Sequence, residues 1–349
     1  MHVTPILPQI EIARVLPSNQ SEKINYVART HEVNLINFGK AHVNAKGMVF
    51  KGLKMMRETY PMWDQYPSLY QRHKLLKSLY LKSKIYNLKS RPLLTVVDGY
   101  GATCYYHWMW DQLVRINLVK KDLGDDFMLA LPDVYFVNNF CIKSLEMIGI
   151  GKDRVIVLKK RDAATSDHVF FPTWILGGGK DGTTYDSQII QTRNDLLKYC
   201  EAYNQLKFSL GERIFISRSK QKKRIIINQE EVDKLLAKYG FAVVCMEDLS
   251  FENGISVSYN SKYTIAQCGS GLSNIIFQKA GSKILELYPK LNYDLNHAWF
   301  SEMAQAGDMH HSYQYCKIDS DNIVINEFHT DMIVDLEVLE KNIRIMIGN

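Results

Sequence analysis

Residues 213–289 carry the clearest secondary-structure signal and read RIFISRSKQKKRIIINQEEVDKLLAKYGFAVVCMEDLSFENGISVSYNSKYTIAQCGSGLSNIIFQKAGSKILELYP. Short runs rich in β-branched and aromatic residues alternate here with segments of helical periodicity. We expect strands at 213–219, 241–247, 263–269 and 283–289, and helices at 230–240 and 271–280. Helices between strands are typical of parallel sheets, because the chain must cross back before each new strand. The stretch therefore predicts a parallel, Rossmann-like sheet that begins near residue 211.

The residues before this stretch alternate in the same way, though less regularly. We expect strands at 93–97, 127–134, 154–160 and 168–174, and helices at 105–121, 141–150 and 187–206. Short apolar runs at 5–7 and 33–36 are candidate strands, and 68–88 is expected to form an amphipathic basic helix or two short ones. A last helix over 332–347 is expected to pack back on the fold. The whole pattern predicts an α/β protein.

The composition is that of an ordinary globular protein. Of the 349 residues, 46% are hydrophobic and 23% are charged, whereas a disordered chain combines low hydrophobicity with high net charge. The length excludes a small disulfide-stapled module and favours two domains or one large unit. The formal net charge of +6 is small, and the basic residues are interleaved with acidic ones along the chain. Nucleic-acid binding is therefore not expected.

The cysteine and hydropathy patterns bear on the compartment. The six cysteines lie tens of residues apart without a CxxC pair, which favours reduced, mostly buried thiols. The first thirty residues contain no continuous apolar run, and nowhere do eighteen apolar residues follow one another. We therefore expect a cytoplasmic protein, and peripheral association with the inner face of the plasma membrane is left open.

The sequence QCGSGLSN, residues 267–274, is the strongest local signal for a ligand. It follows an expected strand and opens an expected helix. Gly269 and Gly271 allow a ligand to approach the backbone closely, and the N–H groups at a helix start attract anions. The segment predicts a phosphate site, and a tight turn without a ligand is the alternative. It is not the nucleophile elbow of hydrolases, which needs glycine where Cys268 stands.

Basic residues follow the strand at 213–219. Arg218 ends this strand, and Lys222, Lys223 and Arg224 lie in the loop just beyond it. Side chains at the carboxyl end of a strand in an open α/β sheet point into the ligand crevice, where arginine can bind a diphosphate through two parallel hydrogen bonds. The two lysines are expected to be solvated, and a structural role remains the alternative for Arg218.

His107, Asp111 and Arg115 are spaced four residues apart on an expected helix, so they share one face. A histidine with a carboxylate in reach can act as a general base. The same three residues can instead form a structural network.

Other motifs are not assigned a site. The segment GGGK at 177–180 is followed by Asp181, where a P-loop needs Ser or Thr. Asp319 and Asp321 have the spacing of a metal-binding pair, but a polar turn explains them, so no metal site is predicted. The basic residues of 72–84 are expected to form a solvated helix face. The aromatic residues that can stack on sugars or fill a core are Tyr60, Trp63, Tyr66 and Tyr70.

Two blocks make the chain resemble glycosyltransferase family 61, of the bacterial capsule or lipopolysaccharide type. The first is Tyr106-His107-Trp108, followed by Asp111 and Arg115, and the second is the stretch quoted at the start of this section. The resemblance covers about residues 90–345.

The chain departs from the family pattern in the segment 267–274, which we call the glycine turn. Cys268 stands where the family usually has histidine, and Gln267 stands where it usually has proline. A role for the missing histidine therefore does not carry over to this chain.

The resemblance implies a GT-B architecture, with two Rossmann-like domains that face each other across a cleft. Residues 1–207 would form the acceptor-binding domain, residues 208–330 the nucleotide-sugar-binding domain, and residues 331–349 a C-terminal helix that packs back on the domains. The implied reaction is an inverting transfer of a sugar from a nucleotide-diphosphate sugar to a hydroxyl of a glycan or lipid-linked glycan, without a metal or other cofactor. A UDP-linked donor is expected, and CDP and GDP are left open.

The same resemblance implies roles for individual residues. His107 is the expected base, with Asp111 orienting it or acting as the base itself. The diphosphate would be held by the two arginines and by backbone amides of the glycine turn. Glu286, at the end of an expected strand, would accept hydrogen bonds from ribose hydroxyls, and its alternative is a surface acid. The expected donor-binding residues are Arg218, Arg224, Gly269, Ser270, Gly271, Leu272, Ser273, Asn274 and Glu286.

Two other functions remain open from the sequence. One is a non-catalytic glycan- or nucleotide-binding subunit, and the other is a transferase that moves a pyruvyl, acyl or phospho group to a glycan.

Overall fold

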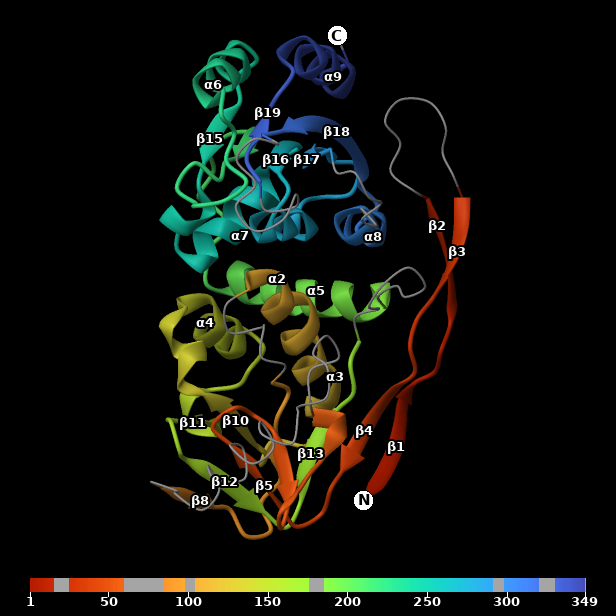
Figure 1. The fold of residues 1–349 in the computed structure, drawn as a ribbon, viewed down its shortest axis with the longest axis vertical. Helices are drawn as coiled ribbons and strands as arrows, with labels where there is room; N and C mark the ends of the chain where they lie inside the picture. The colour runs from red at the N-terminus through yellow and green to blue at the C-terminus, as the bar shows by residue number, and fades with distance from the viewer. Residues whose placement is uncertain are drawn as a thin grey trace. The chain divides into compact units, whose positions relative to one another are not determined.

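The computed structural model describes residues 1–15, 25–59, 84–97, 104–175, 185–290, 298–319 and 330–348. The chain forms two units, both drawn in Figure 1. Unit 1 contains Met1–Glu11 and Arg29–Leu196, and unit 2 contains Ile12–Ala28 and Leu197–Asn349. The strands β2 (Glu11–Val15) and β3 (Asn25–Arg29) pair with each other in a two-stranded sheet.

Unit 1 is built on two sheets. The strands of the first, in spatial order, are β1 (His2–Leu7), β4 (Val33–Asn37), β13 (Val169–Pro172), β9 (Leu93–Leu94), β10 (Met128–Pro132) and β11 (Val155–Leu158). The last four run parallel, whereas β1 and β4 are antiparallel to their neighbours. The strands of the second sheet are β7 (Lys54–Met55), β6 (Val49–Lys51), β5 (Ala41–Asn44), β12 (Ala163–Ser166) and β8 (Ile85–Asn87).

Both sheets of unit 1 contribute to one apolar core. Val43 and Val49 come from the second sheet, and Leu93, Leu158 and Phe171 come from the first. All five side chains are fully buried, and burial of such side chains is the main stabilising term of a fold.

The helices of unit 1 include the segment that carries the histidine motif. They are α2 (Tyr105–His107), a π-helical turn (Trp108–Gln112), α3 (Leu113–Leu123), α4 (Asn139–Met147) and α5 (Asp186–Ala202), with 3-10 helices at Arg57–Thr59, Asp133–Val137 and Lys152–Arg154. The indole N–H of Trp108 donates to Ser144 Oγ of α4 at 2.8 Å, which ties α4 to the π-helical turn. The boundary between the units falls within α5.

Unit 2 is built on one six-stranded sheet. Its strands, in spatial order, are β15 (Ala242–Val244), β14 (Arg213–Ile216), β16 (Tyr263–Gln267), β17 (Lys283–Pro289), β18 (His310–Ile318) and β19 (Met332–Ile333). The first five are parallel, and β19 is antiparallel to β18.

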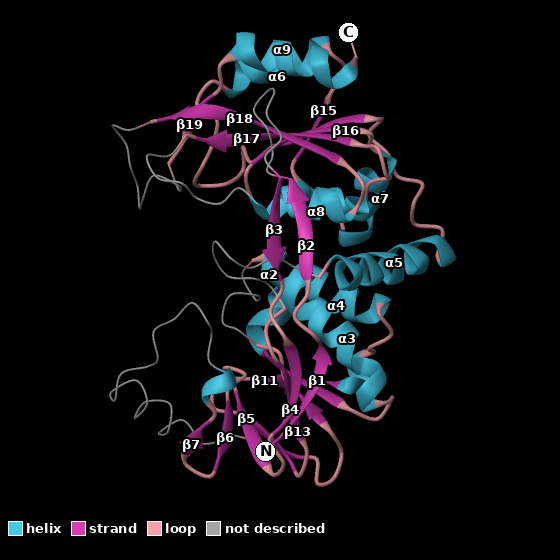
Figure 2. Ribbon diagram, turned by 90° about the vertical axis from the view of Figure 1, so that its right-hand side faces the viewer, coloured by secondary structure: helices cyan, strands magenta, loops and turns pink. Residues whose placement is uncertain are grey.

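Helices cover both faces of this sheet (Figure 2). The helices α6 (Gln229–Lys238) and α9 (Leu336–Ile347) lie on one face, where Leu236 and Ile343 join a core with Phe215, Ile265 and Leu285. On the other face lie α7 (Phe251–Asn260), α8 (Ala298–Ala306) and the 3-10 helix Ser270–Phe277. Unit 2 also contains a short 3-10 helix at Met246–Asp248.

The predicted α/β class is confirmed, and so is the parallel sheet over 213–289. Several details were wrong, and three of them concern the type of an element. The predicted helix 271–280 is the 3-10 helix Ser270–Phe277. The predicted last helix begins at Leu336, not at 332, because Met332–Ile333 pairs with β18 as an edge strand. The end of the predicted basic helix 68–88 is the strand Ile85–Asn87, which pairs with β12.

Several predictions fall outside the described residues. They concern most of the basic helix, the aromatic segment, the GGGK loop and the second aspartate of the 319–321 turn, namely residues 68–83, Tyr60, Trp63, Tyr66, Tyr70, 177–180 and Asp321.

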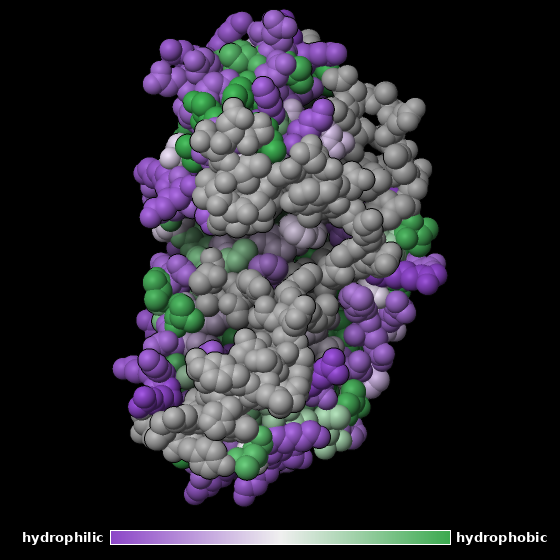
Figure 3. Space-filling view, in the orientation of Figure 1, coloured by the Kyte–Doolittle hydropathy of each residue, from purple (hydrophilic) through white to green (hydrophobic). Residues whose placement is uncertain are grey.

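The described surface carries no extensive apolar face in the view of Figure 3, where hydrophilic side chains predominate and apolar ones form small scattered groups. Single exposed apolar residues such as Val137 and Ile345 are ordinary on a folded protein. Among the helices described, none is long and apolar enough to cross a membrane.

Candidate functional site

The carboxyl ends of β14 and β16 bring two arginines onto the glycine turn of unit 2. The two strands pair up to Ile216 and Ala266, and the chain then leaves β14 through Ser217 and Arg218. Arg224 returns to the same place, where its Nη1 donates to the carbonyl of Cys268 at 3.2 Å. Arg224, which is predicted to hold the diphosphate, therefore lies at this turn, and diphosphate binding stays a prediction.

Arg218 lies directly against Gly269. A Cβ atom built on Gly269 would overlap Nη1 of Arg218 and would lie only 3.0 Å from its Cζ. The backbone of Gly269 is extended, with φ of 164°, so this glycine is needed for space and not for an unusual conformation. The turn leaves room for the guanidinium because position 269 has no side chain.

The guanidinium of Arg218 is in an electrostatically unfavourable place. Burial, and then the positive charge of Arg224, lower the pKa of Arg218 to about 10. Its Nε is buried and has no hydrogen-bond partner among the residues that the structure describes. Because an arginine is normally paired when it leaves water, a site with two adjacent guanidinium groups favours a bound anion.

The 3-10 geometry narrows the choice of backbone amides that can meet this anion. The N–H of Leu272 donates to the carbonyl of Gly269 at 2.9 Å, and a 3-10 helix bonds each later amide to the carbonyl three residues before. The N–H of Leu272 is therefore already bonded within the turn. Binding of the diphosphate by the other predicted amides, those of Gly271, Ser273 and Asn274, stays a prediction.

The side chains of the turn brace the turn itself. Ser273 Oγ donates to the carbonyl of Ser270, and Asn274 Nδ2 donates to the carbonyl of Gly271 at 2.9 Å. Leu272 is fully buried and belongs to the interior. Within the turn, the half-exposed residues are Ser270 and Gly271.

Glu286 is not at the end of its strand, as predicted, but in the middle of β17. Its side chain is 1% exposed, and Oε2 lies 3.1 Å from Nε2 of His311 on β18, whose side chain is 2% exposed. The alternative of a surface acid is therefore wrong. The contact with ribose hydroxyls stays a prediction.

Cys268 points into the same buried cluster and not toward solvent. It is 4% exposed, and burial followed by the charge of Glu286 raises the pKa of its thiol well above the ordinary value. The thiol is therefore neutral near pH 7, and it cannot supply the charge that a histidine at this position could carry.

The basic loop beyond Arg218 is solvated at its tip, in agreement with the sequence. Lys222 is exposed, and Lys223 is half-exposed. Lys220 forms a surface ion pair with Asp248 at 2.7 Å.

In unit 1, Asp111 and Arg115 form a buried ion pair. Arg115 Nη2 lies 2.8 Å from Asp111 Oδ2, with side-chain exposures of 0% and 2%. Arg115 also donates to the carbonyls of Val96 and Pro172, at 2.8 and 3.1 Å, and its guanidinium lies 4.4 Å from the ring centre of Trp174. Arg115 thus anchors the start of α3 to the end of β13 and to the residues that follow β9. This supports the structural network as a role for Asp111 and Arg115.

His107 is the more accessible member of the motif. It is half-exposed at the end of α2, and its ring meets that of Tyr106 edge-on, with 5.6 Å between ring centres. Asp111 belongs to the π-helical turn that follows. A contact between His107 and Asp111 stays a prediction.

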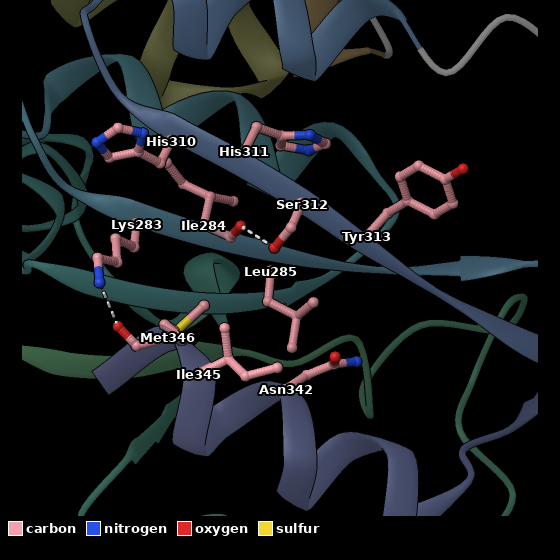
Figure 4. A pocket seen from close by; sticks show the side chains of 10 residues that line it. All are labelled: Lys283, Ile284, Leu285, His310, His311, Ser312, Tyr313, Asn342, Ile345 and Met346. Carbon is pink, nitrogen blue, oxygen red and sulfur yellow. Dashed lines mark hydrogen bonds between the residues drawn. The ribbon is translucent and has the colours of Figure 1, made fainter. Parts of the chain in front are cut away.

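A separate pocket of about 280 Å³ lies between the first residues of β17 and β18 and the last turns of α9 (Figure 4). It is at the opposite end of the sheet from the glycine turn. Two of its polar side chains are bound to backbone carbonyls: Lys283 Nζ donates to Met346 at 2.8 Å, and Ser312 Oγ donates to Ile284 at 3.1 Å. The amino group of Lys283 is thus already paired, unlike Nε of Arg218 at the glycine turn. Within the described residues, no group of three or more metal-ligating side chains is found.

These features define an α/β protein with two arginines at a glycine turn, at the carboxyl ends of a parallel sheet. The family model of glycosyltransferase 61 matches residues 105–285, which is more than half of the chain and spans α2 to β17. The chain therefore belongs to glycosyltransferase family 61, and this membership supports a glycosyltransferase activity with a nucleotide-sugar donor and a glycan acceptor. A search of the curated proteins finds no match.

Proposed function

We propose that the protein is an inverting glycosyltransferase with a GT-B architecture, which moves a sugar from a nucleotide-diphosphate sugar to a hydroxyl of a glycan. The observation that carries the proposal is the pair Arg218 and Arg224 at the glycine turn of unit 2. The two-unit chain, with parallel strands in each unit, supports the architecture.

The arginine pair suits the leaving group of this reaction. As the bond between the sugar and the diphosphate breaks, negative charge grows on the diphosphate oxygens. Donors that are already in place stabilise this charge without reorganisation, and a guanidinium offers two parallel N–H groups to it. In the proposal, Arg218 and Arg224 bind the diphosphate together with backbone amides of the glycine turn, among them that of Gly271.

The attacking hydroxyl must lose its proton as it attacks the anomeric carbon from the side opposite the diphosphate, which inverts that carbon. His107 is the base in this proposal, because Asp111 is already committed to the buried pair with Arg115. Asp111 orients His107 in this proposal, which is the role that the family resemblance implies for it.

Other details of the proposal rest on the family resemblance. They are a UDP-linked donor, a reaction without an essential metal, and a glycan or lipid-linked acceptor of bacterial surface polysaccharide synthesis. The proposed cytoplasmic location rests on the cysteine and hydropathy patterns of the sequence, and peripheral association with the membrane is its alternative.

Product analysis tests the proposal. The purified protein is incubated with nucleotide sugars and glycan acceptors in EDTA, and nucleoside diphosphate release and the anomeric configuration of the product are measured. We expect transfer with inversion. We expect an Arg218→Ala variant to be about a hundredfold slower, which is the scale of losing one charge-stabilising donor.

Activity of Arg218→Ala within threefold of wild type would remove Arg218 from the site. Consumption of a pyruvyl, acyl or phospho donor instead would identify another transferase, and turnover of no donor would favour the binding subunit.

A further inference from the structure

The side chain of Gln267 joins the two ends of the loop that carries both arginines. Its Oε1 accepts a hydrogen bond from the backbone N–H of Arg218 at 2.7 Å, and its Nε2 donates to the backbone carbonyl of Arg224 at 3.0 Å. Gln267 itself is only 1% exposed. One buried amide group thus fixes the backbone of both residues.

The backbone at these two positions needs such a partner. The ladder between β14 and β16 ends at Ile216 and Ala266, and the N–H of Ser217 is bonded to the carbonyl of Val244 on the other side. The next amide, that of Arg218, has left the ladder, and an unpaired buried amide is costly. Gln267 supplies its acceptor.

Arg224 has an uncommon backbone conformation. Its φ is +56°, in the left-handed region that residues with a side chain seldom occupy. Its carbonyl is held by Gln267, and the N–H of the following residue, Ile225, donates to Asp331 Oδ1 at 2.9 Å. These two bonds hold a conformation that directs the Arg224 side chain back to the carbonyl of Cys268.

We propose that Gln267 is a positioning residue for the diphosphate of the donor, which it affects only through Arg218 and Arg224. The inference rests on the proposed function, because it takes the arginine pair as the diphosphate site. By holding both ends of the loop, Gln267 keeps the two guanidinium groups together against their mutual repulsion before the ligand arrives. Groups that are held in place in advance bind more tightly, because less order is lost on binding.

Two substitutions separate the parts of this role. Gln267→Met has a similar volume and removes both hydrogen bonds. Gln267→Glu keeps the acceptor for Arg218 but cannot donate to the carbonyl of Arg224 when ionised, and it adds a negative charge that competes with the diphosphate. The matched control is Gln278→Met, because Gln278 is also fully buried and donates to Ser261 Oγ and Thr264 Oγ1, at 2.5 and 2.7 Å, away from the arginines.

The first readout is calorimetric titration with UDP, GDP, CDP and ADP. We expect Gln267→Met to weaken the preferred diphosphate about tenfold, the loss typical when a supporting partner of a binding group is removed. Gln267→Glu should weaken the binding further, and Gln278→Met should bind within about twofold of wild type, since Gln278 lies outside the site.

In an Arg218→Ala background, Gln267→Met should cause a much smaller additional loss of affinity, because a residue that acts through Arg218 has less left to position. A merely structural role would weaken binding equally in both backgrounds.

The second readout needs no ligand. Hydrogen exchange of the amides in 217–225 should become faster in Gln267→Met than in wild type or Gln278→Met. Unchanged exchange in this loop would overturn the inference, and so would faster exchange with unchanged diphosphate affinity. If wild type binds none of the four nucleotides, the proposed function fails and the positioning role with it, whereas the exchange rates still decide whether Gln267 holds the loop.

Discussion

The guanidinium of Arg218 occupies the space that a side chain at position 269 would need, since a Cβ on Gly269 would overlap Nη1 of Arg218. The glycine and the arginine are therefore one feature of the site. The sequence suggested that the glycines let a ligand approach the backbone. The structure shows that the absence of a side chain at position 269 makes room for the guanidinium of Arg218.

Gly269→Ala is expected to impair binding without unfolding the protein. The added Cβ displaces the far end of a long side chain, which can move at little cost to stability, but the guanidinium then leaves its place. Misplacement of a binding group by about 1 Å can cost up to a hundredfold, so we expect nucleoside diphosphate affinity to fall at least about tenfold. The control is Gly254→Ala in α7, where nothing lies within 4 Å of the added Cβ. Wild-type affinity in Gly269→Ala would show that Arg218 does not need this position.

His107→Ala is expected to separate chemistry from donor binding. A general base contributes about a hundredfold to ten-thousandfold in rate, and His107 belongs to a different unit from the arginines. The rate of sugar transfer should therefore fall by at least about a hundredfold. The affinity for nucleoside diphosphate should stay within about twofold of wild type. Steady-state kinetics and calorimetry measure the two quantities, and a His107→Ala variant with full transfer activity would return the role of base to Asp111.

Asp111→Ala is expected to destabilise unit 1 strongly. The substitution leaves the fully buried guanidinium of Arg115 without its carboxylate, and breaking a buried pair in this way costs about 3 kcal/mol or more. The free energy of unfolding in urea measures the loss. Asp248→Ala removes a carboxylate from the pair with Lys220, whose side chains are about half exposed, and should cost no more than about 1 kcal/mol. Equal effects of the two substitutions would contradict the structural role of Asp111.

The buried thiols predict slow alkylation and a loss of stability at high pH. Burial raises the pKa of Cys200 and of Cys316 from 9.0 to about 12, and that of Cys268 well above 9.0. Above pH 9.0 the unfolded chain loses thiol protons that the folded chain retains, so these groups lower the free energy of unfolding as the pH rises toward 12. Mass spectrometry after iodoacetamide treatment at about pH 9 should find these cysteines modified at least about tenfold more slowly in the folded protein than in urea. Equal rates at Cys268 in the two states would contradict its burial.

The sequence predicts the sheet of unit 2 well because each strand there is decided by its own residues. The runs that become β14, β16 and β17 are rich in β-branched, aromatic or other apolar residues and are bounded by glycine or polar turns. The errors occur where pairing outweighs local preference. Met332–Ile333 resembles the start of a helix but pairs with β18, and Ile85–Asn87 continues a helical pattern but pairs with β12.

The candidate site is predictable only in part. Arg218 and the glycine turn follow from their place at strand ends. The contact of Glu286 with His311 depends instead on the register of β17 and β18, which local sequence patterns do not show. The role of Gln267 depends on where two strands stop pairing. Its place beside the glycine turn was a signal, but no pattern in the sequence shows which backbone groups its side chain reaches.

Calorimetric titration with UDP, GDP, CDP and ADP in EDTA tests the central claim most directly, when wild type, Arg218→Ala and Arg213→Ala are compared. Arg213 is the matched control, because it lies at the other end of β14, where it donates to the carbonyl of Tyr239 at 2.7 Å. The account predicts that wild type and Arg213→Ala bind one of these nucleotides selectively and that Arg218→Ala binds it far more weakly. Binding by Arg218→Ala as tight as by wild type, or no binding by any of the three proteins, would contradict it.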